Sequence, residues 1–202
     1  MTRGLFGPGT IILGGGAVVL TLFLAVGFLL PGQWTANAEA TIPADAEAVL
    51  ALLDSPEGWA QWTPWPDSTT RSGPERGAGA QIAWDSRELG IGSFRIDDAG
   101  ADGVRYSVRV EGDGGSGMQT TGTVTVTTTA QGTRVVWAED GDLGNNPLMG
   151  YWALTMDRAQ STELLKSLDR LAEVIDEAAG DAASEPTSAS ADSVTSDSAP
   201  SR

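Results

Sequence analysis

Near residue 146 the hydrophobic period of this chain changes, and that change restricts the fold more than any single motif does. From Gly77 to Asp142 apolar side chains recur at every second position, with glycine-rich breaks between the runs. The clearest run is 104–111 (VRYSVRVE), where valine and tyrosine alternate with charged or hydroxyl side chains. A period of two predicts an antiparallel meander of about five or six strands, with one face buried and the other in solvent.

After residue 146 the period becomes helical. Apolar side chains recur at spacings of three or four residues, at Leu164, Leu168, Leu171 and Ile175. This pattern predicts a long amphipathic helix that closes the domain. On the other side of the meander, residues 34–43 predict a strand, and Asp45 predicts the N-cap of a short helix. The fold class that follows is α+β, with one antiparallel sheet against a long C-terminal helix.

An apolar run precedes this domain. Residues 11–30 (IILGGGAVVLTLFLAVGFLL) contain no charge, and none occurs between Arg3 and Glu39. A helix of that length rises roughly 30 Å, the thickness of the hydrocarbon core of a bilayer. The run therefore predicts one transmembrane helix and a lipid bilayer as a partner.

The alternative is a cleaved signal peptide, because Ala36-Asn37-Ala38 offers a cleavage pattern of small residues. Both interpretations of the N-terminal segment stay open. If the helix is retained, Arg3 as the flanking positive charge places the N-terminus in the cytoplasm, and the body on the non-cytoplasmic side of the membrane.

These patterns divide the chain into three parts. Residues 1–33 form the anchor, 34–180 the domain, and 181–202 an acidic tail rich in serine and alanine. The tail has no apolar periodicity with which to offset its loss of conformational entropy, so it is predicted to be disordered.

Composition excludes several kinds of chemistry. The chain has no cysteine and no histidine, which excludes thiol nucleophiles, Ser/His triads and Cys/His metal sites. The formal net charge of -15 repels polyanions, so no nucleic-acid partner is expected. Carboxylates occur near the predicted strand ends and are interpreted as solvated: Asp85, Asp97, Asp98, Glu139, Asp140 and Asp142. We predict no catalytic residue, no cofactor and no metal ion, although a site made of carboxylates alone stays open.

Several short motifs occur in a characteristic order between residues 34 and 177. They are Trp34, Ile42-Pro43-Ala44, Asp54 with Trp59, Trp62, Pro64 and Trp65, Gly77 and Gly79 before Trp84, Gly132 to Val135 before Trp137, and Asn146-Pro147-Leu148. In this order they resemble the START-like (SRPBCC) superfamily, in its membrane-anchored polyketide cyclase/dehydrase-type branch. The resemblance implies a helix-grip fold, in which the antiparallel sheet wraps around the long C-terminal helix. It also implies an apolar cavity between sheet and helix that takes lipids or other hydrophobic molecules, with no fixed catalytic set.

Aromatic side chains are the candidates for lining that cavity. The chain has seven tryptophans. Six aromatic residues on predicted strands, or on the lead into the last helix, are predicted to line the cavity, with ordinary core packing as the alternative: Trp65, Trp84, Phe94, Tyr106, Trp137 and Trp152. Trp59 and Trp62 are instead expected in a structural cluster.

Three functions are compatible with these features. The favoured one is a non-enzymatic, membrane-tethered module that binds a hydrophobic small molecule or lipid. The second is an enzyme of the polyketide cyclase or aromatase type, which the lack of histidine disfavours. The third is a structural or interaction module without a ligand, for which a filled cavity would be the sign.

Overall fold

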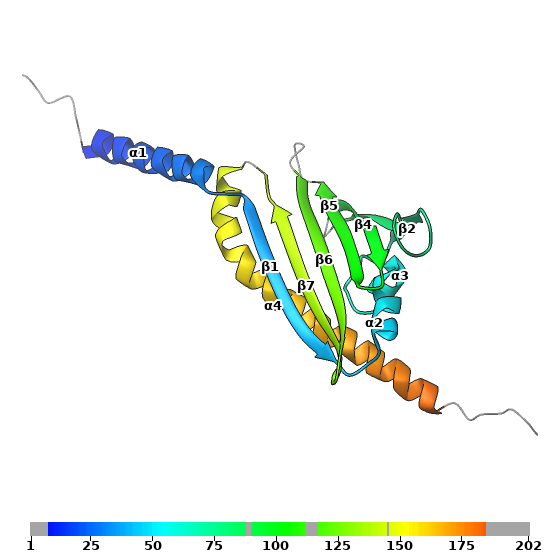
Figure 1. The fold of residues 1–202 in the computed structure, drawn as a ribbon. Coiled ribbons are helices and arrows are strands. Elements are labelled where there is room, and N and C mark those ends of the chain that lie inside the picture. The colour runs from blue at the N-terminus through cyan, green and yellow to red at the C-terminus, as the bar shows by residue number, and fades with distance from the viewer. Residues whose placement is uncertain (1–7, 88–89, 112–116, 145, 185–202) are drawn as a thin grey trace, which may run out of the picture.

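The computed structural model describes residues 8–87, 90–111, 117–144 and 146–184 (Figure 1). The elements, in chain order, are α1 (Pro8–Leu29), β1 (Gln33–Ile42), α2 (Ala46–Leu53), α3 (Pro56–Trp59), β2 (Thr69–Ser72), β3 (Gln81–Ser86), β4 (Gly90–Gly100), β5 (Gly103–Glu111), β6 (Gly117–Thr129), β7 (Gly132–Asp142) and α4 (Pro147–Ser184).

The strands form one seven-stranded antiparallel sheet in the order β1-β7-β6-β5-β4-β3-β2. The predicted meander is confirmed, because β3 to β7 follow one another both in the chain and in the sheet. The sequence interpretation missed β2, in which all four residues are exposed and which therefore has no alternation to reveal it. At the β6–β7 turn, Gly132 adopts a φ of 121°, a conformation that favours glycine.

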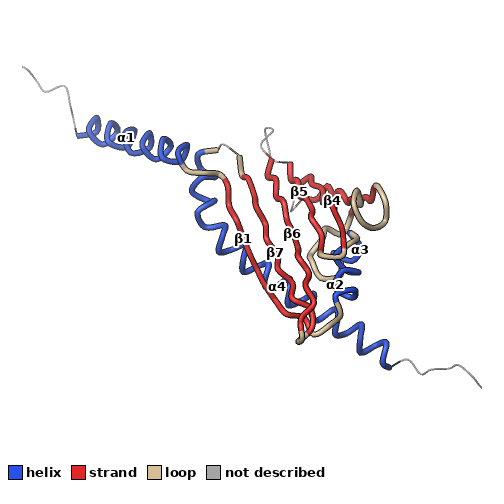
Figure 2. The backbone as a smooth tube through the Cα atoms, viewed as in Figure 1, coloured by secondary structure: helices blue, strands red, loops and turns tan. Residues whose placement is uncertain are grey.

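Alternation along the strands builds the core. In β1 and β7 buried and exposed residues alternate almost without interruption, so every second side chain points to one face. We call this the inner face. The closing helix α4 runs along it (Figure 2), and the leucines that predicted the helix are buried there. The predicted α+β helix-grip fold is confirmed.

The closing helix also protects the free edge of β1. The backbone N–H of Thr35 donates to Asp157 Oδ1 at 3.1 Å, and that of Asn37 donates to Ser161 Oγ at 3.2 Å. An uncovered edge of this kind would present unpaired donors to other chains. The side chains of α4 therefore accept hydrogen bonds from β1 that a further strand would otherwise accept.

The short helices place an aromatic side chain over the inner face. Asp45 occupies the predicted N-cap of α2, but its side chain makes no capping hydrogen bond, which corrects the expectation. The N-cap residue of α3, Ser55, does form a capping hydrogen bond, because its hydroxyl accepts from the N–H of Gly58 at 3.0 Å. Trp59, at the end of α3, is fixed when its Nε1–H donates to the carbonyl of Leu53 at 2.6 Å.

The helix α1 leads away from the sheet (Figure 1). Its side chains are described from residue 14 onward, so the first residues of the predicted span 11–30 lie outside that description. Over the part of the chain that is described, no helix combines the length and the apolar character needed to cross a membrane. At the other end, α4 continues to Ser184, and the rest of the predicted tail lies outside the described residues.

Candidate functional site

The inner face holds an aromatic cluster centred on Trp59. Its ring centroid lies 4.6 Å from that of Trp62, 5.1 Å from Phe94, 4.8 Å from Tyr106 and 5.5 Å from Trp137. All five side chains are buried, and most of these contacts are tilted or edge-to-face, the arrangements that aromatic pairs prefer. Trp59 and Trp62 thus occupy the structural cluster expected of them.

Four of the six predicted lining residues lie on strands of this face, and Trp65 packs against it from the loop between α3 and β2. Phe94, Tyr106 and Trp137 belong to the cluster, whereas Trp65 and Trp84 form a second pair with ring centroids 5.8 Å apart. Trp65 joins the two groups, since its ring lies 5.1 Å from that of Phe94. The sixth residue, Trp152, is elsewhere: it lies on α4 and is 57% exposed. Their role in lining a cavity stays a prediction.

A buried polar network adjoins the cluster. The hydroxyl of Tyr106 donates to Glu139 Oε1, and Trp137 Nε1–H donates to that hydroxyl at 2.8 Å. From α4, Gln160 Nε2 donates to Glu139 Oε2 at 2.9 Å. Glu139 is only 6% exposed, so its interpretation as a solvated carboxylate is wrong. The missed signal was its register, two positions beyond Trp137 on the buried side of the strand.

The pKa of both acidic groups in this network lies above its ordinary value. Burial raises the pKa of the Glu139 carboxyl, and the hydrogen bonds from Tyr106 and Gln160 oppose that rise only in part. Burial, together with the neighbouring carboxylate, raises the pKa of Tyr106 well above its ordinary value. Both oxygens of this buried carboxyl accept a hydrogen bond, so its polar atoms are satisfied within the domain.

This raised pKa predicts a pH-dependent stability. The ordinary pKa of Glu139 is 4.5, and below that pH the carboxyl is neutral in both the folded and the unfolded chain. As the pH rises from 4.5 through the higher pKa of the folded state, the unfolded chain loses this proton first. The folded state then binds more protons than the unfolded one, so the free energy of unfolding falls. Urea unfolding of the wild type and Glu139→Gln should show the wild type losing stability relative to the variant over this window. A difference that does not vary with pH would contradict the assignment.

Glycines on neighbouring strands make room for three inner-face rings. Trp34 pairs with Gly141, Trp84 with Gly92, and Tyr106 with Gly122. In each pair a Cβ on the glycine would lie between 2.0 and 2.4 Å from a ring atom of its partner. Each ring therefore lies across the glycine opposite it. Because Gly122 is also the register partner of Glu139, this arrangement lets Tyr106 reach across β6 to the carboxyl.

Three buried indole donors have no acceptor among the described residues. The Nε1–H groups of Trp34, Trp65 and Trp84 are all inaccessible and make no hydrogen bond. Trp34 is 4% and Trp84 7% exposed. Orphaned buried donors are rare in folded proteins because each costs about 1–3 kcal/mol, so the acceptors of these three indoles must lie outside the described residues.

Trp34 and Trp84 lie toward the end of the sheet where α1 joins it. Trp34 is the second residue of β1, and Trp84 pairs with Gly92 near the start of β4. Inner-face side chains at this end are incompletely covered, since Val108 and Val110 are only half-buried. At the opposite end of β5 the corresponding residue, Val104, is buried. The inner face is thus less closed where the unpartnered indoles lie.

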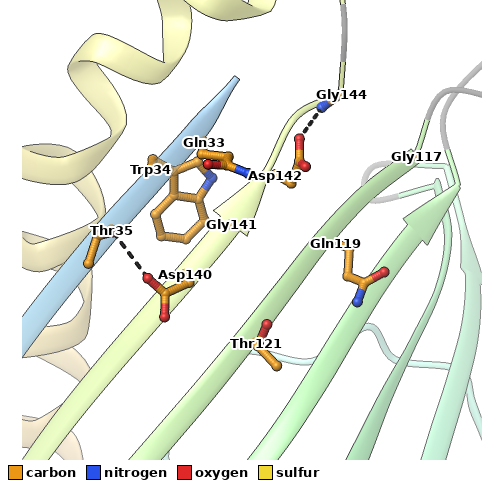
Figure 3. A pocket seen from close by; sticks show the side chains of 10 residues that line it. All are labelled: Gln33, Trp34, Thr35, Gly117, Gln119, Thr121, Asp140, Gly141, Asp142 and Gly144. Carbon is orange, nitrogen blue, oxygen red and sulfur yellow. Dashed lines mark hydrogen bonds between the residues drawn. The ribbon is translucent and has the colours of Figure 1, made fainter. Parts of the chain in front are cut away.

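The outer face of the sheet carries a hollow of different chemistry. It has a volume of about 600 Å³ and is lined by residues of β1, β6 and β7 and of the loop after β7 (Figure 3). Asp140 accepts from the hydroxyl of Thr35 at 3.1 Å, and Asp142 accepts from the N–H of Gly144 at 2.7 Å. Its carboxylates are therefore already engaged within the protein. Over the described residues, no group of acidic side chains is placed to hold a metal ion.

A third feature is an apolar hollow of about 550 Å³ between α2 and the C-terminal half of α4. Ile42 and Ile175 form its buried floor, and Leu52 lies on one side of it. Its size falls within the range of small-molecule sites. This hollow opens at the end of the domain away from the unpartnered indoles. A ligand there would have apolar contacts but no hydrogen bond from those indoles.

Comparison with known proteins agrees with this architecture. A family model described as polyketide cyclase / dehydrase and lipid transport matches residues 33–176. No curated protein matches the chain.

Solved structures share the fold at low sequence identity. An uncharacterized protein from Rhizobium leguminosarum is 18% identical, with a TM-score of 0.52 over 72% of this chain and 95% of its own. A hypothetical protein from Helicobacter pylori is 10% identical, with a TM-score of 0.53 over 70% of this chain and 86% of its own. The di-domain ARO/CYC from the steffimycin biosynthetic pathway is 13% identical, with a TM-score of 0.53 over 73% of this chain and 52% of its own.

Proposed function

Since the chain belongs to the polyketide cyclase / dehydrase and lipid transport family, we propose that its domain binds a hydrophobic small molecule or lipid that carries an oxygen acceptor. The site lies on the inner face, toward the end of the sheet where α1 joins. The observation that carries the proposal is the set of buried indole donors without acceptors. A core that served packing alone would gain stability by losing them.

The chemistry of the inner face supports this kind of ligand. Its aromatic and valine side chains suit an apolar body, whereas the indole N–H of Trp84 and of Trp34 suits a carbonyl, carboxyl or ester oxygen. The hydroxyl of Tyr106 and the carboxyl of Glu139 lie deeper in the domain and form a second polar point. A mostly hydrocarbon ligand that carries an oxygen at the indole end and a second polar group farther along matches this distribution.

Native mass spectrometry of the full chain purified in mild detergent tests the proposal. We expect a hydrophobic molecule to co-purify with the chain, and a fluorescent fatty acid to bind to delipidated protein. Empty preparations, together with no binding of the fatty acid at micromolar concentration, would contradict it and favour a structural module.

The buried carboxyl favours one alternative. A cyclase or aromatase type of enzyme would require a general acid, and burial raises the pKa of Glu139 in the direction that this role needs. In that case a bound polyketide-like compound would change in mass or absorbance on incubation with the wild type, and would stay unchanged with Glu139→Gln. A compound that binds and is released intact supports the non-enzymatic function.

We propose in addition that residues 11–30 hold the domain at a lipid bilayer, with the body on the non-cytoplasmic side. The support is the uncharged sequence from residue 4 to residue 38 and the exposure of the large apolar side chains described on α1. N-terminal sequencing of the mature chain distinguishes this anchor from a cleaved signal peptide, for which the chain would begin near Glu39.

A further inference from the structure

Two uncharged stretches of the sequence meet in space. No charged residue occurs between Arg3 and Glu39 or between Asp142 and Asp157, although the chain as a whole carries a formal charge of -15. The first stretch contains α1 and the second contains the first turns of α4. These two helices contact each other at the end of the sheet (Figures 1 and 2).

The contact between the two helices is specific. The rings of Phe23 and Tyr151 are stacked, with centroids 4.5 Å apart and planes within 2° of parallel. The hydroxyl of Tyr151 donates to the backbone carbonyl of Phe23 at 2.7 Å. The C-terminal end of α1 is therefore held against α4.

Glycines let the two backbones approach closely at this contact. A Cβ on Gly27 would lie 2.3 Å from the carbonyl oxygen of Pro147, and one on Gly150 would lie 2.8 Å from the carbonyl oxygen of Gly27. Small residues at helix contacts have the same use within membranes. The last turns of α1 and residues 147–151 thus form one packed unit. The domain is therefore not joined to α1 by a flexible linker alone.

The outside of this unit is apolar. Its exposed large hydrophobic residues are Val18, Val19, Leu20, Leu22, Phe23, Val26, Phe28 and Leu29 on α1, and Leu148, Trp152 and Leu154 on α4. We call this set the junction surface. The only other exposed large hydrophobic residues in the described part of the chain are Ile91 and Leu165. A concentration of this kind marks a binding surface.

The arrangement of the junction surface identifies its partner as lipid. Val18, Val19 and Leu20 are consecutive, so they point in three directions about 100° apart around α1. A helix that is apolar on all sides is buried either in the core of a large protein or in lipid, and the proposed anchor supplies the lipid. The indole of Trp152 is of the type that concentrates at the boundary between hydrocarbon and water.

We infer that the first turns of α4, with Leu148, Trp152 and Leu154, insert into the bilayer interface beside the C-terminal end of α1. This inference rests on the proposed anchor and adds a second membrane contact to it. The domain is then held at the bilayer in a fixed orientation. The end of the sheet that carries the unpartnered indoles faces the lipid, so a hydrophobic ligand passes between bilayer and domain with little exposure to water.

The absence of cysteine allows a direct test with single labelled positions. Trp152→Cys and Leu154→Cys report on the junction, Val18→Cys reports on the anchor, and Leu165→Cys is the matched control. Leu165 is also an exposed leucine of α4, at 45% exposure, but it lies farther along the helix from α1. All four positions are exposed, so labelling leaves the packed core intact.

Each full-length variant is coupled to an environment-sensitive fluorophore and reconstituted into phosphatidylcholine vesicles, with and without a spin-labelled acyl chain as quencher. We expect blue-shifted emission and quenching at positions 18, 152 and 154, and water-like, unquenched emission at position 165. If position 18 is quenched while 152 and 154 behave like 165, the anchor holds and the inserted α4 is refuted. If position 18 is also unquenched, the anchor itself fails, and the inference fails with it.

Discussion

Trp59→Ala is expected to lower the free energy of unfolding by about 3–5 kcal/mol, a large fraction of the stability of a domain of this size. The side chain is 2% exposed and lies at the centre of the aromatic cluster, with four rings between 4.6 and 5.5 Å away. Truncation removes these contacts and leaves a cavity that the sheet cannot close. It also removes the donor that satisfies the carbonyl of Leu53.

Chemical denaturation of the full chain in detergent measures this loss. Leu165→Ala is the control, because truncation at a 45% exposed position of α4 outside the junction surface should change the free energy of unfolding by about 0.5 kcal/mol or less. Similar values for the two variants would show that the inner face is not packed around Trp59.

The sequence predicts the architecture because periodicity reports burial directly. The leucine spacing in α4 indicates one buried side and is confirmed, and the alternation in 104–111 is confirmed at Val104 and Tyr106, whereas Val108 and Val110 are half-buried. The strand β2 has no buried side, so its pairing with β3 leaves no trace in hydrophobicity.

The site is harder to predict because it depends on single residues. Glu139 follows the alternation of β7, but a carboxylate near a glycine is more often a surface residue, and only the tertiary structure supplies the donors of Tyr106 and Gln160. Trp152 is adjacent to Ala153, which is 2% exposed. A step of one residue rotates a helical side chain by about 100°, which turns the indole outward.

Trp84→Phe is expected to weaken ligand binding about five- to tenfold, the equivalent of one hydrogen bond to an acceptor on the ligand. The phenyl ring has no N–H and also lacks the indole atoms that lie over Gly92. Because the deleted donor makes no hydrogen bond within the described protein, the stability loss should be limited to this lost contact and be smaller than that of Trp59→Phe.

Trp59→Phe is the matched control for this substitution. It also deletes an indole N–H, but the N–H of Trp59 donates to the carbonyl of Leu53 at 2.6 Å. The loss should therefore appear in the free energy of unfolding, by about 1–3 kcal/mol, and not in ligand affinity.

The most direct measurement is titration of delipidated full-length wild type, Trp84→Phe and Trp59→Phe with a fluorescent fatty acid in the same detergent. A site at the unpartnered indoles predicts a weaker affinity for Trp84→Phe alone, with wild-type affinity for Trp59→Phe. Equal affinities for all three proteins, together with a stability loss in Trp84→Phe as large as that in Trp59→Phe, would contradict it. Trp84 would then be part of the packed core.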